Sequence, residues 1–235
     1  MICFFTSATG PYQTPALYTE NCFVERLKAA LPTPVRGLWV ANDPATHDHT
    51  VPFALEVRDA FVHAGFTVAE WEILDDRNAD RAPELVARAN LIVLSGGEVE
   101  VQSRFFERIG LKALLRDWDG VLVGISAGSM NSAEEVIVPP EGPGGPPDPA
   151  LWLRVPGLGL TRYHIVPHFQ FIRTQPMPGG GSADDFFRQV GRFITLYALN
   201  DGSYIYKDAD GNETICGEAY LIQGGEIVKI SEDEG

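Results

Sequence analysis

Short apolar runs alternate with longer amphipathic stretches along most of this chain, and this alternation is the strongest constraint on its fold. Strands of a parallel sheet are buried on both faces, so they are short and continuously apolar, and amphipathic crossover helices connect them. The expected strands are residues 3–6, 37–41, 67–73, 91–94, 121–125 and 164–167. The expected helices are residues 21–31, 52–64, 84–89, 102–116, 127–136 and 183–196. The sequence therefore predicts an α/β fold with a mostly parallel sheet flanked by helices.

The last part of the chain changes character. The runs 204–206, 214–216, 219–222 and 226–230 are short and strand-like, and the turn pairs Asp210-Gly211 and Gly224-Gly225 separate two pairs of them. This pattern predicts C-terminal β-hairpins at the sheet edge. A chain of 235 residues with 45% hydrophobic content can bury a full core, so we expect one α/β domain over residues 1–235.

One segment, 139–149, is too rich in proline and glycine for a helix or a central strand. It must be a loop. Long loops of this kind inside a compact domain are often functional, so it either borders an active site or is a surface insertion.

Charge and cysteine content narrow the function classes. The 32 acidic side chains outnumber the 18 basic ones and give a net charge of -14, which opposes binding to nucleic acid. The three cysteines are widely separated and lack metal-site spacing, which favours a reducing compartment over disulfides or zinc. The first residues lack a basic secretion signal, and no apolar run approaches membrane-spanning length. We therefore expect a cytoplasmic protein without a membrane partner, a metal or a cofactor, and its oligomeric state is not indicated.

The sequence Gly124-Ile125-Ser126-Ala127-Gly128 ends one of the expected strands. Small residues around Ser126 allow a sharp strand-to-helix corner that exposes the serine hydroxyl, although packing alone also favours small residues there. The helix that follows directs unpaired backbone N–H groups toward the site of attack. Ser126 is therefore a candidate nucleophile.

A serine nucleophile needs a base, and five histidines are available. His47 and His49 belong to a polar segment that suits a loop before a helix better than a metal cluster, and His63 suits a helix end. His164 lies inside an expected strand. His168 follows Pro167 at the carboxyl end of that strand, so it is the candidate base.

A third strand end carries Ser95-Gly96-Gly97-Glu98. In open α/β sheets, ligands gather at the carboxyl ends of the strands, where this turn would meet Ser126. The N–H groups of Gly97 and Ala127 would then form an oxyanion hole. The three strand ends together indicate acyl transfer.

These three blocks, with Pro167-His168-Phe169 as the last, resemble the signature of the peptidase E family over most of the chain. The resemblance implies a fold similar to class I glutamine amidotransferases and a cytoplasmic serine exopeptidase or dipeptidase acting on short peptides. Cyanophycinases are similar relatives. It implies Ser126 as nucleophile, His168 as base, and Gly97 and Ala127 as oxyanion donors.

The family's catalytic acid lies on the loop after the nucleophile helix, and ungapped counting puts Glu141 at that position. An acid there would hold the imidazole in the required tautomer. A small shift in alignment would select Glu134, Glu135 or Asp148 instead.

Two departures bear on specificity. Family members that prefer an N-terminal aspartate carry an arginine where this chain has Ser182-Ala183-Asp184, so aspartate specificity is in doubt unless Arg173 or Arg188 substitutes. Glu98 replaces a usual asparagine. Its carboxylate either binds a substrate amino terminus or points to solvent.

Three other kinds of protein share parts of these motifs. An α/β-hydrolase esterase shares the serine motif but needs a longer interval before its histidine. A non-catalytic binding protein would keep the scaffold without the acid. An amidotransferase is disfavoured, because it needs cysteine in place of Ser126 and usually an acid in place of Gln170.

Overall fold

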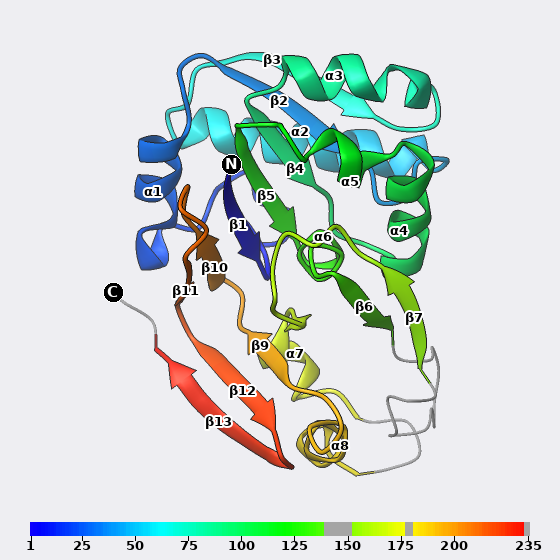
Figure 1. The fold of residues 1–235 in the computed structure, drawn as a ribbon. Helices are drawn as coiled ribbons and strands as arrows, with labels where there is room; N and C mark the ends of the chain where they lie inside the picture. Colours follow the sequence, from blue (N-terminus) through cyan, green and yellow to red (C-terminus); the bar gives the residue numbers. More distant parts are fainter. Residues whose placement is uncertain (139–151, 177–180, 233–235) are drawn as a thin grey trace.

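The computed structural model describes residues 1–138, 152–176 and 181–232 (Figure 1). The expected Pro/Gly loop at 139–149, with Glu141 and Asp148, lies outside the described residues.

A seven-stranded sheet forms the larger half of the molecule. Its order is β11-β10-β1-β5-β4-β2-β3. The five parallel strands are β1 (Ile2–Thr6), β2 (Val35–Val40), β3 (Val68–Leu74), β4 (Leu91–Leu94) and β5 (Val121–Ile125). The two antiparallel strands at the β1 edge are β10 (Tyr204–Lys207) and β11 (Glu213–Cys216). Thr6 pairs with Ile125, and Leu94 pairs with Gly124, so β1, β4 and β5 end at one level.

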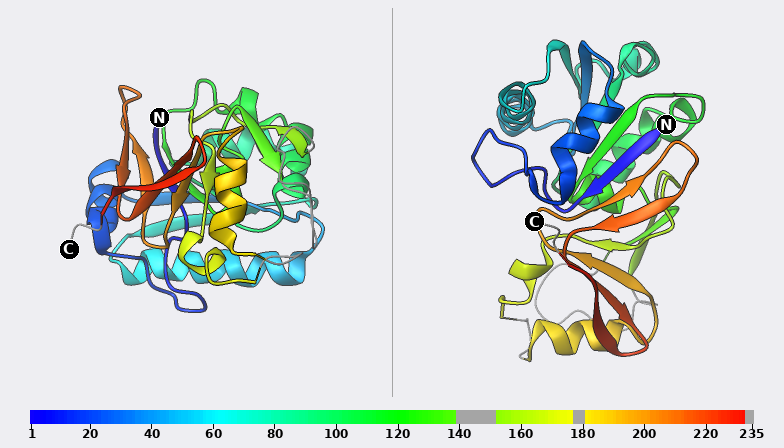
Figure 2. Two further views of the ribbon diagram at one scale, coloured as in Figure 1. Left: turned by 90° about the horizontal axis from the view of Figure 1, so that it is seen from below. Right: turned by 90° about the vertical axis from the view of Figure 1, so that its left-hand side faces the viewer.

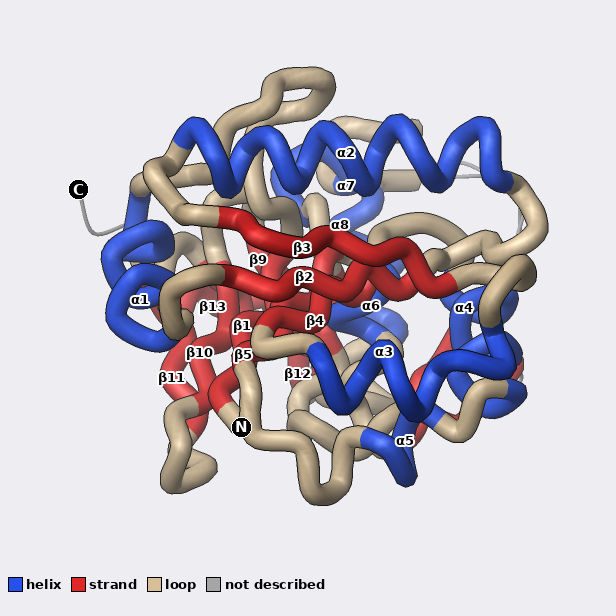
Figure 3. The backbone as a smooth tube through the Cα atoms, turned by 90° about the horizontal axis from the view of Figure 1, so that it is seen from above, coloured by secondary structure: helices blue, strands red, loops and turns tan. Residues whose placement is uncertain are grey.

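Helices cover both faces of this sheet (Figure 3). One face carries α1 (Phe23–Ala30) and α2 (His47–His63). The other carries α3 (Ala82–Arg88), α4 (Val99–Arg108) and α5 (Leu111–Leu114). Alternate strand residues divide between the two cores, as Phe4 and Phe5 do, and both side chains are fully buried. The continuous apolar runs of the sequence thus reflect burial on both faces.

A second sheet of order β13-β12-β9-β8 forms the other half of the molecule (Figure 2). Its strands are β8 (Ile165–Val166), β9 (Leu196–Leu199), β12 (Ala219–Gln223) and β13 (Glu226–Ser231). The helices α7 (Phe169–Ile172) and α8 (Ala183–Val190) pack on it through Phe169, Phe187 and Val190. The two predicted C-terminal hairpins therefore belong to different sheets: β10 and β11 join the large sheet, and β12 and β13 join the small one.

Several predicted helices have different bounds in the structure. The helix expected at 127–136 is only α6 (Ala127–Met130), because the β-branched run that follows forms β6 (Glu135–Val138) against β7 (Leu153–Pro156). The helix expected at 102–116 divides at Gly110, whose φ is 65°. The helix expected at 183–196 ends at Val190.

The remaining elements are short or begin earlier than predicted. The helix expected to begin at Pro52 begins at His47 instead and contains the proline. Two 3₁₀ turns, η1 (Glu20–Cys22) and η2 (Ala79–Arg81), precede α1 and α3. In the part of the chain that the structure describes, no helix combines the length and apolar composition needed to cross a bilayer.

Candidate active site

Ser126 occupies the corner between β5 and α6. Its backbone has φ 50° and ψ -109°, a conformation that residues other than glycine rarely adopt. Its N–H donates to the Thr6 carbonyl (3.1 Å), which ties the corner to β1. At Gly128, a Cβ would lie 2.4 Å from the Leu94 carbonyl oxygen, so glycine lets α6 approach β4 this closely. The local sequence thus holds the Ser126 hydroxyl at the carboxyl edge of the sheet.

His168 follows β8 and precedes α7, with φ 57°. Its Nε2 lies 3.0 Å from Ser126 Oγ. The structure therefore brings the two residues predicted as nucleophile and base within hydrogen-bond distance. His168 is in position to accept the hydroxyl proton when its ring is neutral.

Asp201 lies in the turn that joins β9 of the small sheet to β10 of the large one. Its Oδ1 lies 2.7 Å from His168 Nδ1 and accepts a hydrogen bond from Ser7 Oγ (2.6 Å). Burial would raise the pKa of Asp201, but the hydrogen bonds from His168 and Ser7 outweigh burial and hold that pKa below its ordinary value. An ionised carboxylate at this place fixes the tautomer that leaves Nε2 free to take a proton.

Sequence reasoning did not select Asp201 as a candidate acid, although its carboxylate contacts His168 Nδ1. Glu141 and Asp148 lie outside the described residues, while Glu134 and Glu135 form exposed ion pairs with Lys112 and Arg154. A single hydrogen on Nδ1 serves one carboxylate, and Asp201 takes it. The available signal was an acid two positions after a short apolar run. It was overlooked because Leu196 was assigned to the end of a helix rather than to the start of β9.

The predicted oxyanion loop lies beside the serine. A Cβ at Gly96 would be 3.4 Å from Ser126 Cβ. Gly97 has φ 139°, and a Cβ there would be 2.4 Å from Asn42 Oδ1. No acceptor for the N–H groups of Gly97 and Ala127 occurs among the residues that the structure describes. These two donors are therefore free for a substrate oxygen.

Asn42, which sequence reasoning did not select, holds this loop. Its Nδ2 donates to the Glu98 carbonyl (2.8 Å), and its Oδ1 accepts from the Glu98 N–H (2.7 Å). Asn42 is buried, with 6% exposure, and its own N–H donates to Ser95 Oγ (3.1 Å). The side-chain amide of Asn42 thus holds the two peptide units on either side of Glu98, the residue next to Gly97.

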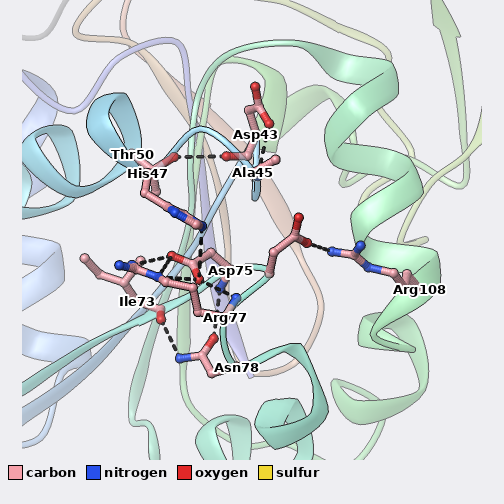
Figure 4. A network of polar contacts seen from close by, with 10 residues as sticks. Asp43, Ala45, His47, Thr50, Ile73, Asp75, Arg77, Asn78 and Arg108 are labelled. Atoms are coloured by element: carbon pink, nitrogen blue, oxygen red, sulfur yellow. Dashed lines mark hydrogen bonds and ion pairs between the residues drawn. The ribbon is translucent and has the colours of Figure 1, made fainter.

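A polar network involves the residues that follow Asn42 in the sequence and those at the carboxyl end of β3 (Figure 4). Asp75 is fully buried and accepts two-pronged hydrogen bonds from Arg77 (Nε 3.0 Å, Nη2 2.6 Å). Arg108 of α4 forms an ion pair with Asp76, whose N–H donates to the Pro44 carbonyl (3.2 Å). The network therefore ties the segment after Asn42 to the helix that follows the oxyanion loop.

His47 and His49 lie in the first turn of α2 rather than in a loop before the helix, and His47 also reaches this network. His47 Nε2 lies 3.9 Å from Asp75 Oδ1. Within residues 1–138, 152–176 and 181–232, no cluster of three or more His, Cys, Asp or Glu side chains is arranged to hold a metal ion.

Of the candidate specificity residues, the two arginines already form ion pairs with carboxylates of this chain. Arg173 donates to both carboxylate oxygens of Asp184 (2.8 and 2.7 Å) and lies 5.2 Å from the Phe169 ring centre. Arg188 pairs with Asp185 at 3.7 Å. Glu98 is exposed at the start of α4.

A serine at a strand end, a histidine and a partly buried carboxylate in mutual contact, on a mostly parallel sheet, have the arrangement that serine hydrolases use for acyl transfer. The chain belongs to peptidase family S51, whose family model matches residues 44–215. This membership supports a serine peptidase. No curated protein matches the chain.

Two solved structures have a similar fold. One is a peptidase from an acI-B1 actinobacterium, with a TM-score of 0.68 and 18% identity over 100% of this chain and 96% of that one. Another is a putative peptidase E protein from Listeria monocytogenes EGD-e, with a TM-score of 0.56 and 13% identity over 97% of both chains. At these identities the likeness shows the shared fold.

Proposed function

We propose that this protein is a serine exopeptidase, of the dipeptidase type, that hydrolyses short peptides with Ser126, His168 and Asp201. The observation that carries this proposal is the unbroken line of contacts from Asp201 Oδ1 to His168 Nδ1 (2.7 Å) and from His168 Nε2 to Ser126 Oγ (3.0 Å). Membership of peptidase family S51 supports the same reaction.

In the first half of the reaction, Ser126 Oγ attacks the peptide carbonyl carbon while His168 Nε2 takes the hydroxyl proton. The carbonyl oxygen becomes an oxyanion that accepts hydrogen bonds from the N–H groups of Gly97 and Ala127. The C–N bond then breaks, and His168 gives its proton to the leaving amine. Asp201 stabilises the charged imidazole while it holds that proton.

In the second half, water attacks the acyl ester on Ser126 and gives its proton to His168. The ester bond breaks, the acid product leaves, and the proton returns to Ser126 Oγ. This cycle needs no metal or cofactor, because the protein supplies the nucleophile, the base and the oxyanion donors.

Charged side chains near the candidate site bear on substrate selection. Glu98 is exposed, directly follows Gly97, and has its backbone held by Asn42. Its carboxylate is proposed to attract a substrate amino terminus. Arg173 is already bound to Asp184, so its capacity to take a second carboxylate is reduced. We therefore expect short peptides without a requirement for N-terminal aspartate, in a cytoplasmic setting.

The test combines a dipeptide and tripeptide panel with fluorophosphonate labelling. The wild-type protein should hydrolyse part of the panel and label at one serine, and Ser126→Ala should abolish both. Ser103→Ala is the matched control, because Ser103 is buried (2% exposed) and its hydroxyl bonds the Pro156 carbonyl, outside the triad. A protein that neither labels nor cleaves any peptide would be a binding member of the fold, and one that cleaves only p-nitrophenyl esters would be an esterase.

A further inference from the structure

Ser7 stands at the end of β1 and is fully buried. Its hydroxyl accepts a hydrogen bond from the His168 backbone N–H (2.7 Å) and donates one to Asp201 Oδ1 (2.6 Å). A serine hydroxyl has one hydrogen to donate, so this hydrogen is committed to Asp201. The same side chain therefore contacts both partners of the candidate nucleophile's proton relay.

The place of Ser7 in the sheet explains why it reaches both groups. Thr6 of β1 pairs with Ile125 of β5, so Ser7 and Ser126 follow neighbouring strands at the same level. His168 follows β8 of the small sheet, and Asp201 lies between the two sheets. Ser7 is thus the group by which the strand next to the nucleophile holds the histidine and the acid.

The hydrogen bond from the His168 N–H to Ser7 holds a strained part of the backbone. His168 has φ 57°, which costs free energy in a residue other than glycine and persists only where its surroundings hold it. Its N–H precedes α7 and donates to Ser7 Oγ. Removing that acceptor would leave the N–H unpaired and free the imidazole to shift away from Ser126.

The hydrogen bond from Ser7 to Asp201 affects the charge of the carboxylate. Ser7 and His168 Nδ1 both contact Oδ1, so Ser7 selects which carboxylate oxygen faces the imidazole. Gln170 Oε1 accepts from the Asp201 N–H (3.0 Å) and holds the backbone from the other side. The hydroxyl also stabilises the ionised carboxylate and spreads part of its charge away from the ring.

We propose that Ser7 is a positioning residue of this site, which orients His168 through its backbone and Asp201 through its carboxylate. This role rests on the proposed function. It predicts that losing the hydroxyl changes catalysis and its pH dependence more than it changes substrate binding.

The test is Ser7→Ala, measured for kcat, KM and the pH profile of kcat/KM on a cleaved peptide. We expect kcat to fall about tenfold to a hundredfold, the range for loss of a hydrogen bond to a charged group, with KM within about twofold of wild type. The acid limb of the profile should move to higher pH. Asp201 loses a donor that lowers its pKa, and its undivided charge then favours the protonated imidazole.

Ser103→Ala again serves as the control, since it removes another buried hydroxyl with one backbone bond. It should lower thermal stability by a similar amount and leave the acid limb in place. An unchanged kcat in Ser7→Ala would overturn the proposal. So would a fall in kcat that is fully explained by the fraction of protein that fluorophosphonate does not label, with no shift of the acid limb.

A second measurement separates this proposal from the proposed function. The proton on His168 Nδ1 can be followed by NMR during a pH titration, without substrate, and assigned by its loss in His168→Gln. A shifted midpoint in Ser7→Ala supports the positioning role even if no peptide is cleaved. An unshifted midpoint in an active peptidase refutes that role and leaves the peptidase intact.

Discussion

Replacing Asp201 by asparagine tests which acid serves His168. Asparagine keeps the size of the side chain but removes its charge, and its amide can present N–H groups to Nδ1. At 2.7 Å, and with an effective dielectric constant of about 20, the attraction between carboxylate and imidazolium is about 6 kcal/mol. His168 is 38% exposed, so solvent screening lowers the effective value to about 4–5 kcal/mol.

That attraction acts when the imidazole holds the serine proton, so its loss should appear in kcat. A loss of about 4–5 kcal/mol corresponds to a fall of roughly 10³- to 10⁴-fold, because each 1.36 kcal/mol is tenfold in rate. Thr6, Ser126 and the oxyanion loop do not contact the substituted group directly, so KM should change much less.

The assay is steady-state hydrolysis of the best peptide from the panel, with Glu141→Gln as the companion variant. Glu141→Gln should stay within about threefold of wild type, because Asp201 already occupies the position beside Nδ1. Thermal unfolding of both variants checks that each is folded. If Glu141→Gln carries the large loss and Asp201→Asn keeps most of the activity, the assignment of the acid is wrong.

Three further predictions concern the loop and an ion pair. Gly97→Ala should lower kcat about a hundredfold to a thousandfold, since its Cβ would lie 2.4 Å from Asn42 Oδ1 and displace an oxyanion donor. Gly211 also has a positive φ (88°), but a Cβ there would have nothing within 4 Å, so Gly211→Ala should show normal kcat in kinetic assays. Asn42→Ala should lower the free energy of unfolding in urea by about 1–3 kcal/mol, because the Glu98 backbone loses two bonds. The hydrogen bond from Arg173 holds the pKa of Asp184 below 3.8, so the stability it contributes is present above that pH and is lost as the pH falls further. The difference in urea midpoint between wild type and Asp184→Asn should therefore shrink below about pH 4, and a constant difference would contradict this assignment.

The parallel sheet and two members of the site were predictable from local sequence. The runs 91–94 and 121–125 match β4 and β5 at both ends, because strands buried on both faces leave an uninterrupted apolar signal. Ser126 follows such a run directly, and the rule that strand ends converge at one edge correctly placed it beside the 95–98 turn. The same rule put His168 in the parallel sheet, which was wrong, because His168 follows β8 of the small sheet and reaches Ser126 from there.

Ser7 and Asn42 were missed for a shared physical reason. Each acts through bonds to residues far along the chain, such as the Ser7 contact with Asp201, 194 positions away. No periodicity or spacing records such a partner. The bounds of α6 and α8 were wrong for a different reason, since short apolar runs after a helix suit a strand equally well and tertiary packing decides between them.

The candidate triad is divided between two sheets, and this division couples activity to completion of the fold. Ser126 emerges from the ribosome before His168 and Asp201, so a growing chain carries the serine without its base and its acid. Asp201 reaches its position only when β9 joins the small sheet and β10 joins the large one. Unfinished or partly unfolded molecules therefore hold an inert serine. Under the proposed function, a cell that makes this protein is exposed to its hydrolytic activity only from molecules in which β9 and β10 have joined their sheets.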